Sequence, residues 1–381
     1  MSGAPQPLRV AVVTGTRAEF GLLAPVMRAV RAHEGLTLQT IVCGAHLLPP
    51  TETWREVERA FGIDARVEMQ RPGEIGRLHD ARALGRGVAG MADAIERLRP
   101  DWVVVLGDRV EALAGAAAAS VGGVATAHIH GGDVAEGVAD EAMRHAITKL
   151  SHLHLAASEQ SARRITRMGE RPEHVRITGS PALDGLYSVV PMDDDAYARL
   201  GSPRALVLMH PIGRDDAAEQ RDTRAVLEGV ASMQLASLAL HPNYDAGRDG
   251  VLRAIELSGV RAIGHLPRPA FLSLLSRLAR DEGVLVGNSS CALIEAGAMR
   301  PALAAVDIGP RQAGRERASN VVHASDVSAK AVASAINAAH AIDLSRVKSP
   351  YGDGRAGERI AAALAAVDPR DPKLLRKRHA D

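Results

Sequence analysis

Short apolar stretches alternate along most of the chain with longer segments in which apolar residues recur every three or four positions. The first apolar stretch, 8–13, ends at a Thr-Gly-Thr turn, and a helical pattern with one apolar face follows at once. A strand, a glycine turn and a helix in this order are typical of a doubly wound α/β domain. The same reading predicts strands at 41–44, 102–107, 125–130, 152–158 and 175–179, and helices at 83–98 and 111–120. The polar region 49–80 is expected to hold a loop and a helix.

A second series of the same kind begins after a segment rich in Pro, Asp and Gly, 181–202, which is typical of a linker. It predicts strands at 206–210, 235–241, 261–266, 284–287 and 302–308, and helices at 214–233, 249–257, 269–280 and 291–299. A chain of 381 residues is long for a single core. We therefore expect two Rossmann-like α/β domains that face each other across a ligand-binding cleft. The expected division is 1–185, 186–350 and a helical tail, 351–381.

Composition excludes several classes of partner. The formal net charge is +1, and two Trp, four Tyr and three Phe leave little surface for stacking bases, so no nucleic acid is expected. No apolar run is long enough for a membrane span or placed as a signal peptide, so no membrane is expected either. Cys43 and Cys291 stand far apart, which favours a reducing compartment and a cytoplasmic protein. The basic end at 373–378 is interpreted as a solvated helix terminus.

A dense group of charged residues follows the predicted strand 125–130. That strand breaks at Gly131-Gly132 and passes into a helix, and the junction carries a group of acidic and basic residues: Asp133, Glu136, Asp140, Glu141, Arg144 and His145. Such a group costs stability unless it is solvated, paired or used. Ligands of parallel sheets bind outside the carboxyl ends of the strands, so this junction is interpreted as the catalytic part of an enzyme.

A second junction, Gly287-Asn288-Ser289-Ser290, follows an apolar strand and precedes the helix predicted at 291–299. Free backbone N–H groups, hydroxyls and a helix dipole suit a diphosphate, although an ordinary N-cap is the commoner explanation of such a motif. Glu295, expected on an exposed face of that helix, would then accept hydrogen bonds from ribose hydroxyls, and Arg311 would offset the phosphate charge.

Other strand ends carry weaker signals. The turn before Arg17 is not GxGxxG, so NAD is not inferred, and Arg17 is either a phosphate ligand or a surface residue. His210 and the His241-Pro242-Asn243 segment end two strands and are interpreted as hydrogen-bonding groups for a nucleotide sugar. Asp108 either points into the cleft or caps the next helix. No clustered metal-ligand motif is present, so neither a metal nor another cofactor is expected.

Together, several of these segments resemble the hydrolysing UDP-N-acetylglucosamine 2-epimerases, the enzymes that begin sialic acid synthesis. The matching segments run in family order from about position 9 to 322: 14–23, 107–109, 128–133, 144–152, 287–290 and 311–315. The resemblance implies the two-domain GT-B fold and a homodimer or homotetramer. It also implies a reaction in which a base removes the sugar C2 proton, UDP leaves C1, and water adds to the resulting glycal to give N-acetylmannosamine.

The resemblance assigns roles to individual residues. Acid–base positions fall on Asp108, His130, Asp133, Asp140 and Arg144. Substrate-binding positions fall on Arg17, His210, Asn243, Gly287, Ser289, Ser290, Glu295 and Arg311.

Two departures from the family pattern leave the substrate open. Asp133 stands where the family has Glu, and Ile212-Gly213 stands where it has Val-Thr. The alternatives are the same reaction on a UDP- or GDP-linked 2,4-diacetamido-trideoxyhexose or on GDP-GlcNAc, a GT-B glycosyltransferase, and an inactive nucleotide-sugar sensor. Non-hydrolysing 2-epimerases carry His-x-Glu-Ala-Gly where this chain has His-Ile-His-Gly-Gly at 128–132, which argues against them.

Overall fold

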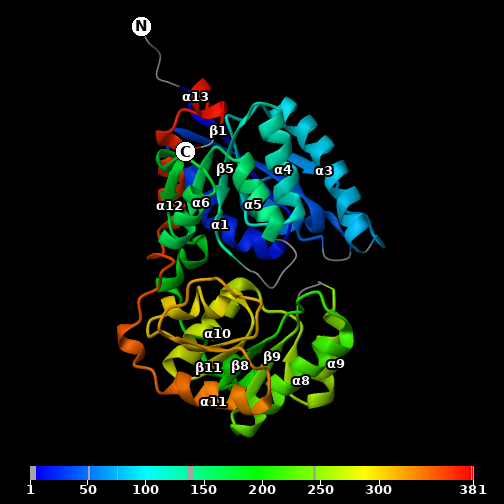
Figure 1. The fold of residues 1–381 in the computed structure, drawn as a ribbon, viewed down its shortest axis with the longest axis vertical. Coiled ribbons are helices and arrows are strands. Elements are labelled where there is room, and N and C mark those ends of the chain that lie inside the picture. The colour runs from blue at the N-terminus through cyan, green and yellow to red at the C-terminus, as the bar shows by residue number, and fades with distance from the viewer. Residues whose placement is uncertain are drawn as a thin grey trace. The chain divides into compact units, whose positions relative to one another are not determined.

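The chain forms two compact units in the computed structural model, which describes residues 6–49, 52–74, 76–134, 141–242, 246–378 and 380. Figure 1 shows both units as ribbons. The first comprises Met1–Asp133, Asp140–Asp184 and Gly354–Asp381, and the second comprises Val134–Ala139 and Gly185–Asp353. Within the described ranges, no helix is both long enough and apolar enough to cross a membrane.

A parallel sheet forms the centre of the first unit. Its strands lie in the order β3 (Ala65–Val67), β2 (Leu36–Cys43), β1 (Leu8–Thr14), β4 (Trp102–Leu106), β5 (Ala125–Ile129), β6 (Leu153–Ala156) and β7 (Val175–Ile177). In the register of β1, Val10 lies opposite Leu38 on one neighbour and Trp102 on the other. The strand order reverses between β1 and β4, and this is the point at which such sheets bind ligands.

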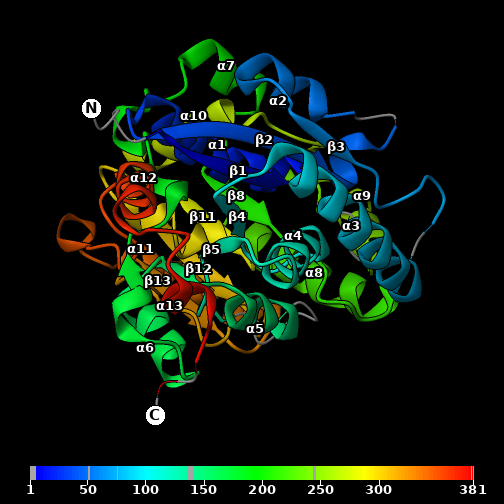
Figure 2. The ribbon, with the colours of Figure 1, turned by 90° about the horizontal axis from the view of Figure 1, so that it is seen from above.

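Helices cover both faces of this sheet, because successive side chains of a strand point to opposite faces. Val10 and Val12 pack toward one helical layer and Ala11 and Val13 toward the other, and all four are buried. The first layer contains α1 (Arg17–Ala32), α2 (Trp54–Phe61) and α12 (Ala356–Ala366), and the second contains α3 (Arg77–Leu98), α4 (Val110–Val121) and α5 (Glu141–Leu150). Figure 2 shows α3, α4 and α5 together on one side of the sheet. Helix α6 (Glu159–Arg167) packs on β6 and β7.

The end of the chain packs into the first unit. The Asp184 carboxylate accepts hydrogen bonds from the backbone N–H groups of Ala356 and Gly357, at 2.8 and 2.6 Å, and so caps the start of α12. Farther along, the Trp102 indole N–H of β4 donates to the Leu364 carbonyl at 3.1 Å. A short helix, α13 (Pro372–Leu375), follows. The segment predicted as a separate tail is therefore an integral part of the first core from Gly354 onward.

The second unit repeats this architecture around a smaller parallel sheet. Its strands lie in the order β10 (Arg261–Ile263), β9 (Ser237–Leu240), β8 (Ala205–Leu208), β11 (Val284–Gly287), β12 (Ala304–Ile308) and β13 (Val321–Ala324). Its helices are α7 (Asp194–Arg199), α8 (Asp216–Ser232), α9 (Arg248–Ser258), α10 (Arg268–Arg280) and α11 (Ala329–His340). The order reverses between β8 and β11, which places the ends of these two strands at the expected ligand position.

The prediction of a helix at 291–299 is wrong. This segment forms two 3₁₀ turns, Ser290–Ala292 and Ala296–Ala298. The Ala296 carbonyl accepts from the N–H of Leu303 at 2.9 Å instead of from a following helical turn. Gly297 packs so tightly that an added Cβ would lie 2.8 Å from the Asn320 side-chain oxygen. The helix dipole expected behind Ser289 and Ser290 is consequently missing from the electrostatics of that junction.

Candidate active site

An ion pair joins the end of β4 to helix α5. Asp108 follows β4, and its carboxylate accepts a hydrogen bond from Nη2 of Arg144 in the first half of α5. The Arg144 side chain is 2 % exposed and that of Asp108 24 % exposed. The helix-capping alternative for Asp108 is wrong, because Arg109 occupies the N-cap position of α4. The structure thus brings together two predicted site residues and leaves the carboxylate accessible to a ligand.

Helix α5 is also attached to β5 through a buried histidine. His128 Nε2 lies 2.7 Å from the Gly107 carbonyl oxygen, so this nitrogen carries the proton and donates. Its Nδ1 lies 3.2 Å from the hydroxyl of Thr148, one turn after Arg144. Burial lowers the pKa of His128 to about 3, which keeps the ring neutral at physiological pH. A neutral ring with a fixed tautomer holds α5 and the turn before Asp108 in register.

His130 and Asp133 form a second, more deeply buried group at the end of β5. The Asp133 carboxylate accepts from His130 Nδ1 at 2.9 Å and from the Ser161 hydroxyl at 2.7 Å. His130 Nε2 lies 2.9 Å from the Ser180 hydroxyl oxygen, and this oxygen accepts from the Ala182 N–H. Asp133 is 2 % and Ser180 1 % exposed, and these contacts link the turn after β5 to the start of α6 and to the segment after β7.

The backbone between these two residues requires glycine. His130 itself has a φ of 64°, and Gly132 has a φ of 72°. A Cβ on Gly132 would lie 2.2 Å from the Ser161 carbonyl oxygen. The Gly-Gly turn therefore packs directly against the start of α6, and the shorter Asp133 side chain reaches Ser161 there. In this structure the carboxylate orients His130 and the turn.

The end of β1 carries the predicted phosphate ligand and two buried acids. Arg17 begins α1 and forms an ion pair with Glu56 at 3.2 Å, and both side chains are more than one third exposed. Glu19 is buried, and its Oε2 accepts from the Gly15 N–H at 2.8 Å. Burial raises the pKa of Glu19 to about 8, and the nearby Glu111 carboxylate adds to this effect. Arg17 is thus held by a group that a phosphate could replace.

In the second unit, Asn288 joins the ends of β8 and β11. Its side-chain oxygen accepts from the His210 N–H at 2.8 Å, and its side-chain NH₂ donates to the His210 carbonyl at 2.7 Å. Gly287 comes so close to β8 that an added Cβ would lie 2.0 Å from the Leu208 carbonyl oxygen. Burial, and the positive charge of Arg311, lower the pKa of His210 to about 3. His210 is therefore a neutral, half-buried imidazole at the switch point.

The loop after β12 adds positive charge to this junction. Arg311 Nη1 and Gln312 Nε2 donate to the Asn288 carbonyl at 3.2 and 2.9 Å. Ser289 and Ser290 are half-exposed beside it. The prediction that Glu295 is exposed is wrong. Its side chain is 7 % exposed, and its Oε1 accepts from Arg268 Nη1 at 3.2 Å. The second unit thus gathers an imidazole, two hydroxyls, a guanidinium and a paired carboxylate.

Two predicted site residues, Asp140 and Asn243, lie outside the described residues. Sequence reasoning missed the hydrogen-bond partners that hold the predicted residues in place: Ser161, Ser180, Asn288 as a clamp, Gln312 and Arg268. Asn288 was visible within its motif, whereas Ser161 and Ser180 contact partners 28 and 50 positions away in the chain. Among the described residues, no group of three or more His, Cys, Asp or Glu side chains is arranged to hold a metal ion.

Comparison with known sequences identifies the family of this architecture. Residues 28–365 match the family model described as UDP-N-acetylglucosamine 2-epimerase. The UDP-N,N'-diacetylbacillosamine 2-epimerase (hydrolyzing) of Legionella pneumophila is 32% identical over 97% of this chain and 98% of its own length. The UDP-N-acetylglucosamine 2-epimerase of Neisseria meningitidis is 29% identical over 83% of each chain.

Solved structures show the same fold. The Neisseria meningitidis UDP-GlcNAc 2-epimerase bound to UDP-GlcNAc superimposes with a TM-score of 0.76 at 17% identity, over 94% of this chain and 99% of that chain. The Methanocaldococcus jannaschii UDP-GlcNAc 2-epimerase in complex with UDP-GlcNAc and UDP also gives a TM-score of 0.76, over 94% and 100% of the two chains. The predicted α/β, two-domain GT-B fold is confirmed.

Proposed function

The chain belongs to the UDP-N-acetylglucosamine 2-epimerase family, and on this premise we propose that it is a hydrolysing 2-epimerase. The proposed substrate is a UDP-linked 2-acetamido sugar, and the products are UDP and the free sugar with inverted configuration at C2. The observation that carries this proposal is the pairing of the accessible Asp108 carboxylate with the buried Arg144 guanidinium at the carboxyl end of β4.

The reaction proceeds in two stages. In the first, a carboxylate takes the C2 proton, the C–H electron pair forms the C1–C2 double bond, and the C1–O bond breaks with its electrons going to UDP. In the second, water adds across the double bond, and its hydroxyl joins C1. A proton joins C2 on the face opposite to the one from which the first proton was removed, which inverts C2. One water is consumed, and no redox change occurs.

Asp108 fits the role of proton acceptor among the described carboxylates of the first unit. Arg144 orients the Asp108 carboxylate through a charge-assisted hydrogen bond, and the 24 % exposure of the Asp108 side chain leaves room for a sugar. Asp133, with both oxygens engaged by His130 and Ser161, acts by holding the Gly-Gly turn. We propose that Asp140, at a family acid–base position, supplies the second group.

The second unit binds the nucleotide in this proposal. A departing diphosphate needs fixed positive charge and hydrogen-bond donors. Arg311, Ser289 and Ser290 supply these at the end of β11, and neutral His210 donates from the end of β8. Glu295, held by Arg268, accepts from ribose hydroxyls. Asn243 and the Gly287 backbone complete the proposed set in this unit, and Arg17 of the first unit is proposed as a further phosphate ligand.

Two sugars are candidates for the substrate. The resemblance favours UDP-GlcNAc, with N-acetylmannosamine as the product. The Legionella relative, named for UDP-N,N'-diacetylbacillosamine and 32% identical over nearly its full length, favours a 2,4-diacetamido sugar as the second candidate.

Incubation of the protein with each UDP-sugar in the absence of any acceptor tests the proposal. Free UDP and a free 2-epimeric sugar should appear in equal amounts, and the faster of the two substrates identifies the sugar. A UDP-linked epimer without free UDP would instead indicate a non-hydrolysing enzyme. UDP release only after an acceptor is added would indicate a glycosyltransferase.

A further inference from the structure

The basic end of the chain contacts the helix that carries Arg144. Lys377 follows α13, and its ammonium donates to the backbone carbonyls of Lys149 at 2.7 Å, Ser151 at 2.5 Å and Thr148 at 3.3 Å. Lys149 belongs to the last turn of α5, and Ser151 directly follows that helix. The last carbonyls of a helix lack intrahelical partners and carry partial negative charge, so an ammonium there both caps and stabilises it.

Lys377 is itself fixed by a buried acid. Its ammonium lies 2.7 Å from Glu170 Oε2, and the Glu170 side chain is 4 % exposed. Glu170 also accepts from His154 Nε2 of β6 at 3.0 Å and pairs with Lys149 at 2.6 Å. The chain beyond Lys377 remains attached, because the Ala380 N–H donates to the Gly169 carbonyl at 2.9 Å. This arrangement differs from the solvated terminus that the sequence predicts.

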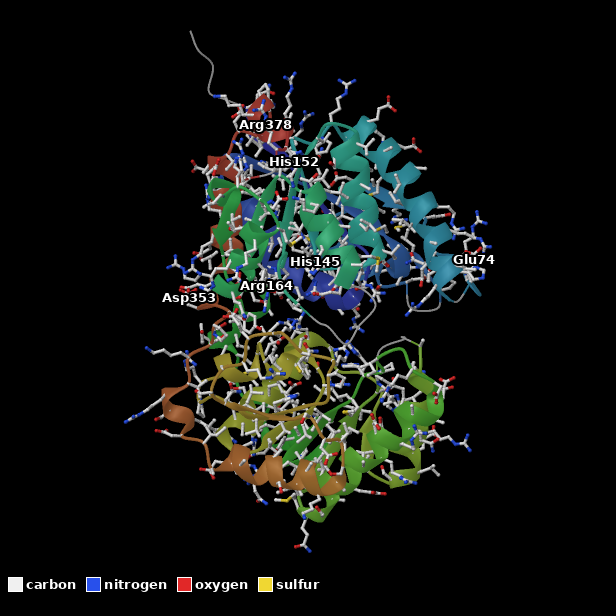
Figure 3. The ribbon with its side chains drawn as sticks, viewed as in Figure 1. Glu74, His145, His152, Arg164, Asp353 and Arg378 are labelled. Atoms are coloured by element: carbon white, nitrogen blue, oxygen red, sulfur yellow. The ribbon has the colours of Figure 1, made fainter. Side chains whose placement is uncertain are left out.

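Helix α5 is therefore held at both ends by charged contacts. Figure 3 labels His145, next to Arg144, and His152, just beyond the helix, toward opposite ends of the first unit. His152 and Arg378 lie close together there and line one small polar recess with Lys377. A ten-residue helix transmits a displacement of one end to the other, because its backbone hydrogen bonds make it stiff.

We propose that Lys377 is a positioning residue for the reaction, holding the C-terminal end of α5 so that Arg144 stays in register with Asp108. This inference rests on the proposed function, because it assumes that Arg144 and Asp108 act on substrate. A misplacement of about 1 Å in such a pair lowers turnover about a hundredfold.

The test compares Lys377→Met with Lys373→Met, which removes an exposed charge from α13 in the same segment. Lys377→Met should lower kcat about tenfold to a hundredfold per folded molecule, with KM and UDP affinity changed less than about threefold. Lys373→Met should match wild type, and Lys377→Arg, which keeps donors for the carbonyls, should recover most of the kcat. Since Lys377 acts through Arg144, adding Lys377→Met to Arg144→Ala should cause no further loss.

Wild-type kcat in Lys377→Met overturns the inference, as does a multiplicative loss in the double variant. Wild-type kcat in Arg144→Ala would refute the role proposed for Arg144. Absence of UDP release from either UDP-sugar by the wild-type protein would refute the proposed function itself, which separates the two failures. If Lys377→Met does not fold, Glu170→Gln provides the second test. It keeps the carbonyl contacts but removes the counter-charge, and it should lower kcat several-fold by the same non-additive route; unchanged kcat there overturns the inference.

Discussion

At the residue scale, Arg144 is a buried cation of the first unit that must be paired. A guanidinium that is 2 % exposed is costly unless its charge is compensated, and Asp108 and Glu141 lie within ion-pair distance of it. Asp108 is the more exposed partner of the pair. An accessible carboxylate held by a buried guanidinium can contact a substrate, whereas it contributes little to the packing of the core.

Asp108→Asn should abolish turnover while leaving UDP binding almost intact. The change removes the proposed proton acceptor, which is worth about a hundredfold to ten-thousandfold in kcat. UDP affinity, measured by calorimetry, should change less than about threefold, because the nucleotide is bound by the second unit in this account. Asp93→Asn, an exposed position on α3, is the matched control. Equal loss of kcat and of UDP affinity would contradict this role.

Arg311→Ala should have the opposite profile. Hydrogen bonds to charged groups contribute about 1.5–3 kcal/mol, so UDP should bind about tenfold to a hundredfold more weakly. Arg346→Ala removes an exposed arginine of the same unit and should leave UDP affinity unchanged. An Arg311→Ala variant that binds UDP as wild type does would remove Arg311 from the nucleotide site.

The sequence indicated where a residue lies in the fold when its motif followed a strand, whereas the catalytic and binding roles of these residues stay predictions. The Gly-Asp-Arg segment indicated Asp108 because it follows an apolar strand, and Asn288 fell within a recognisable small-residue turn. Ser180 gave no such signal, because it lies 50 positions after His130 and its hydroxyl meets that residue only once two more strands and the helices between them have folded. Contacts of that separation depend on tertiary structure, which local pattern does not encode.

At the element scale, buried polar groups hold several of the described strand-to-helix junctions together. The junction after β1 holds Glu19, whose carboxyl accepts from the Gly15 N–H. Glu111 packs against the same turn: a Cβ on Gly15 would lie 2.4 Å from its Cγ. Two acids buried this close favour one of them in its neutral form, which agrees with the raised pKa of Glu19.

Glu19→Gln should therefore alter the alkaline stability of the protein. With a pKa of about 8 in the folded state, Glu19 keeps its proton between pH 4.5 and 8, where the unfolded chain loses it. Stability consequently falls as the pH rises through this window, by about 5 kcal/mol in all for a fully buried acid. Gln stays neutral and removes this dependence. Urea unfolding at pH 6 and pH 9 measures it, and identical pH slopes for wild type and variant would show that Glu19 is ionised.

Prediction of elements succeeded for strands and failed where helices compete with tertiary contacts. Most buried strands were visible as apolar runs, whereas β3 is only three residues long and its alternating Ala65-Arg66-Val67 pattern is too short to be distinctive. The apolar spacing at 291–299 suggested a helix, but Gly297 packed on Asn320 and the Leu303 N–H bonded to Ala296 favour two 3₁₀ turns. The capping role of Lys377 was equally hidden, because its carbonyl partners lie more than 220 positions earlier.

At the scale of the whole molecule, the two units share a topology and a reliance on buried neutral imidazoles. Burial lowers the pKa of His46 and His152 to about 4 and that of His128 and His210 to about 3. The first three belong to the first unit and His210 to the second. The repeat of strands and helices along the sequence predicted both units. The return of the chain to the first unit at Gly354 was not visible in that repeat, because it involves the contact between the Asp184 carboxylate and the Ala356 N–H.

Acid should destabilise both units well above the pH at which carboxylates titrate. Between about pH 4 and 6.5 the unfolded chain protonates these histidines and the folded one does not, so stability falls as the pH falls below 6.5. Unfolding at pH 5.5 should take up at least about two protons, measured by calorimetry in buffers of different ionisation enthalpy. Unfolding without proton uptake at this pH would show that the imidazoles are already charged in the folded protein.

The fate of the hydrogen at C2 tests the central claim most directly. The protein is incubated with UDP-GlcNAc, and separately with UDP-N,N'-diacetylbacillosamine, in D₂O without an acceptor, and the products are examined by NMR and mass spectrometry. A free sugar of inverted configuration carrying one deuterium at C2, formed together with one equivalent of UDP, is the result predicted. Free UDP accompanied by a sugar that retains its original C2 hydrogen and configuration would contradict it.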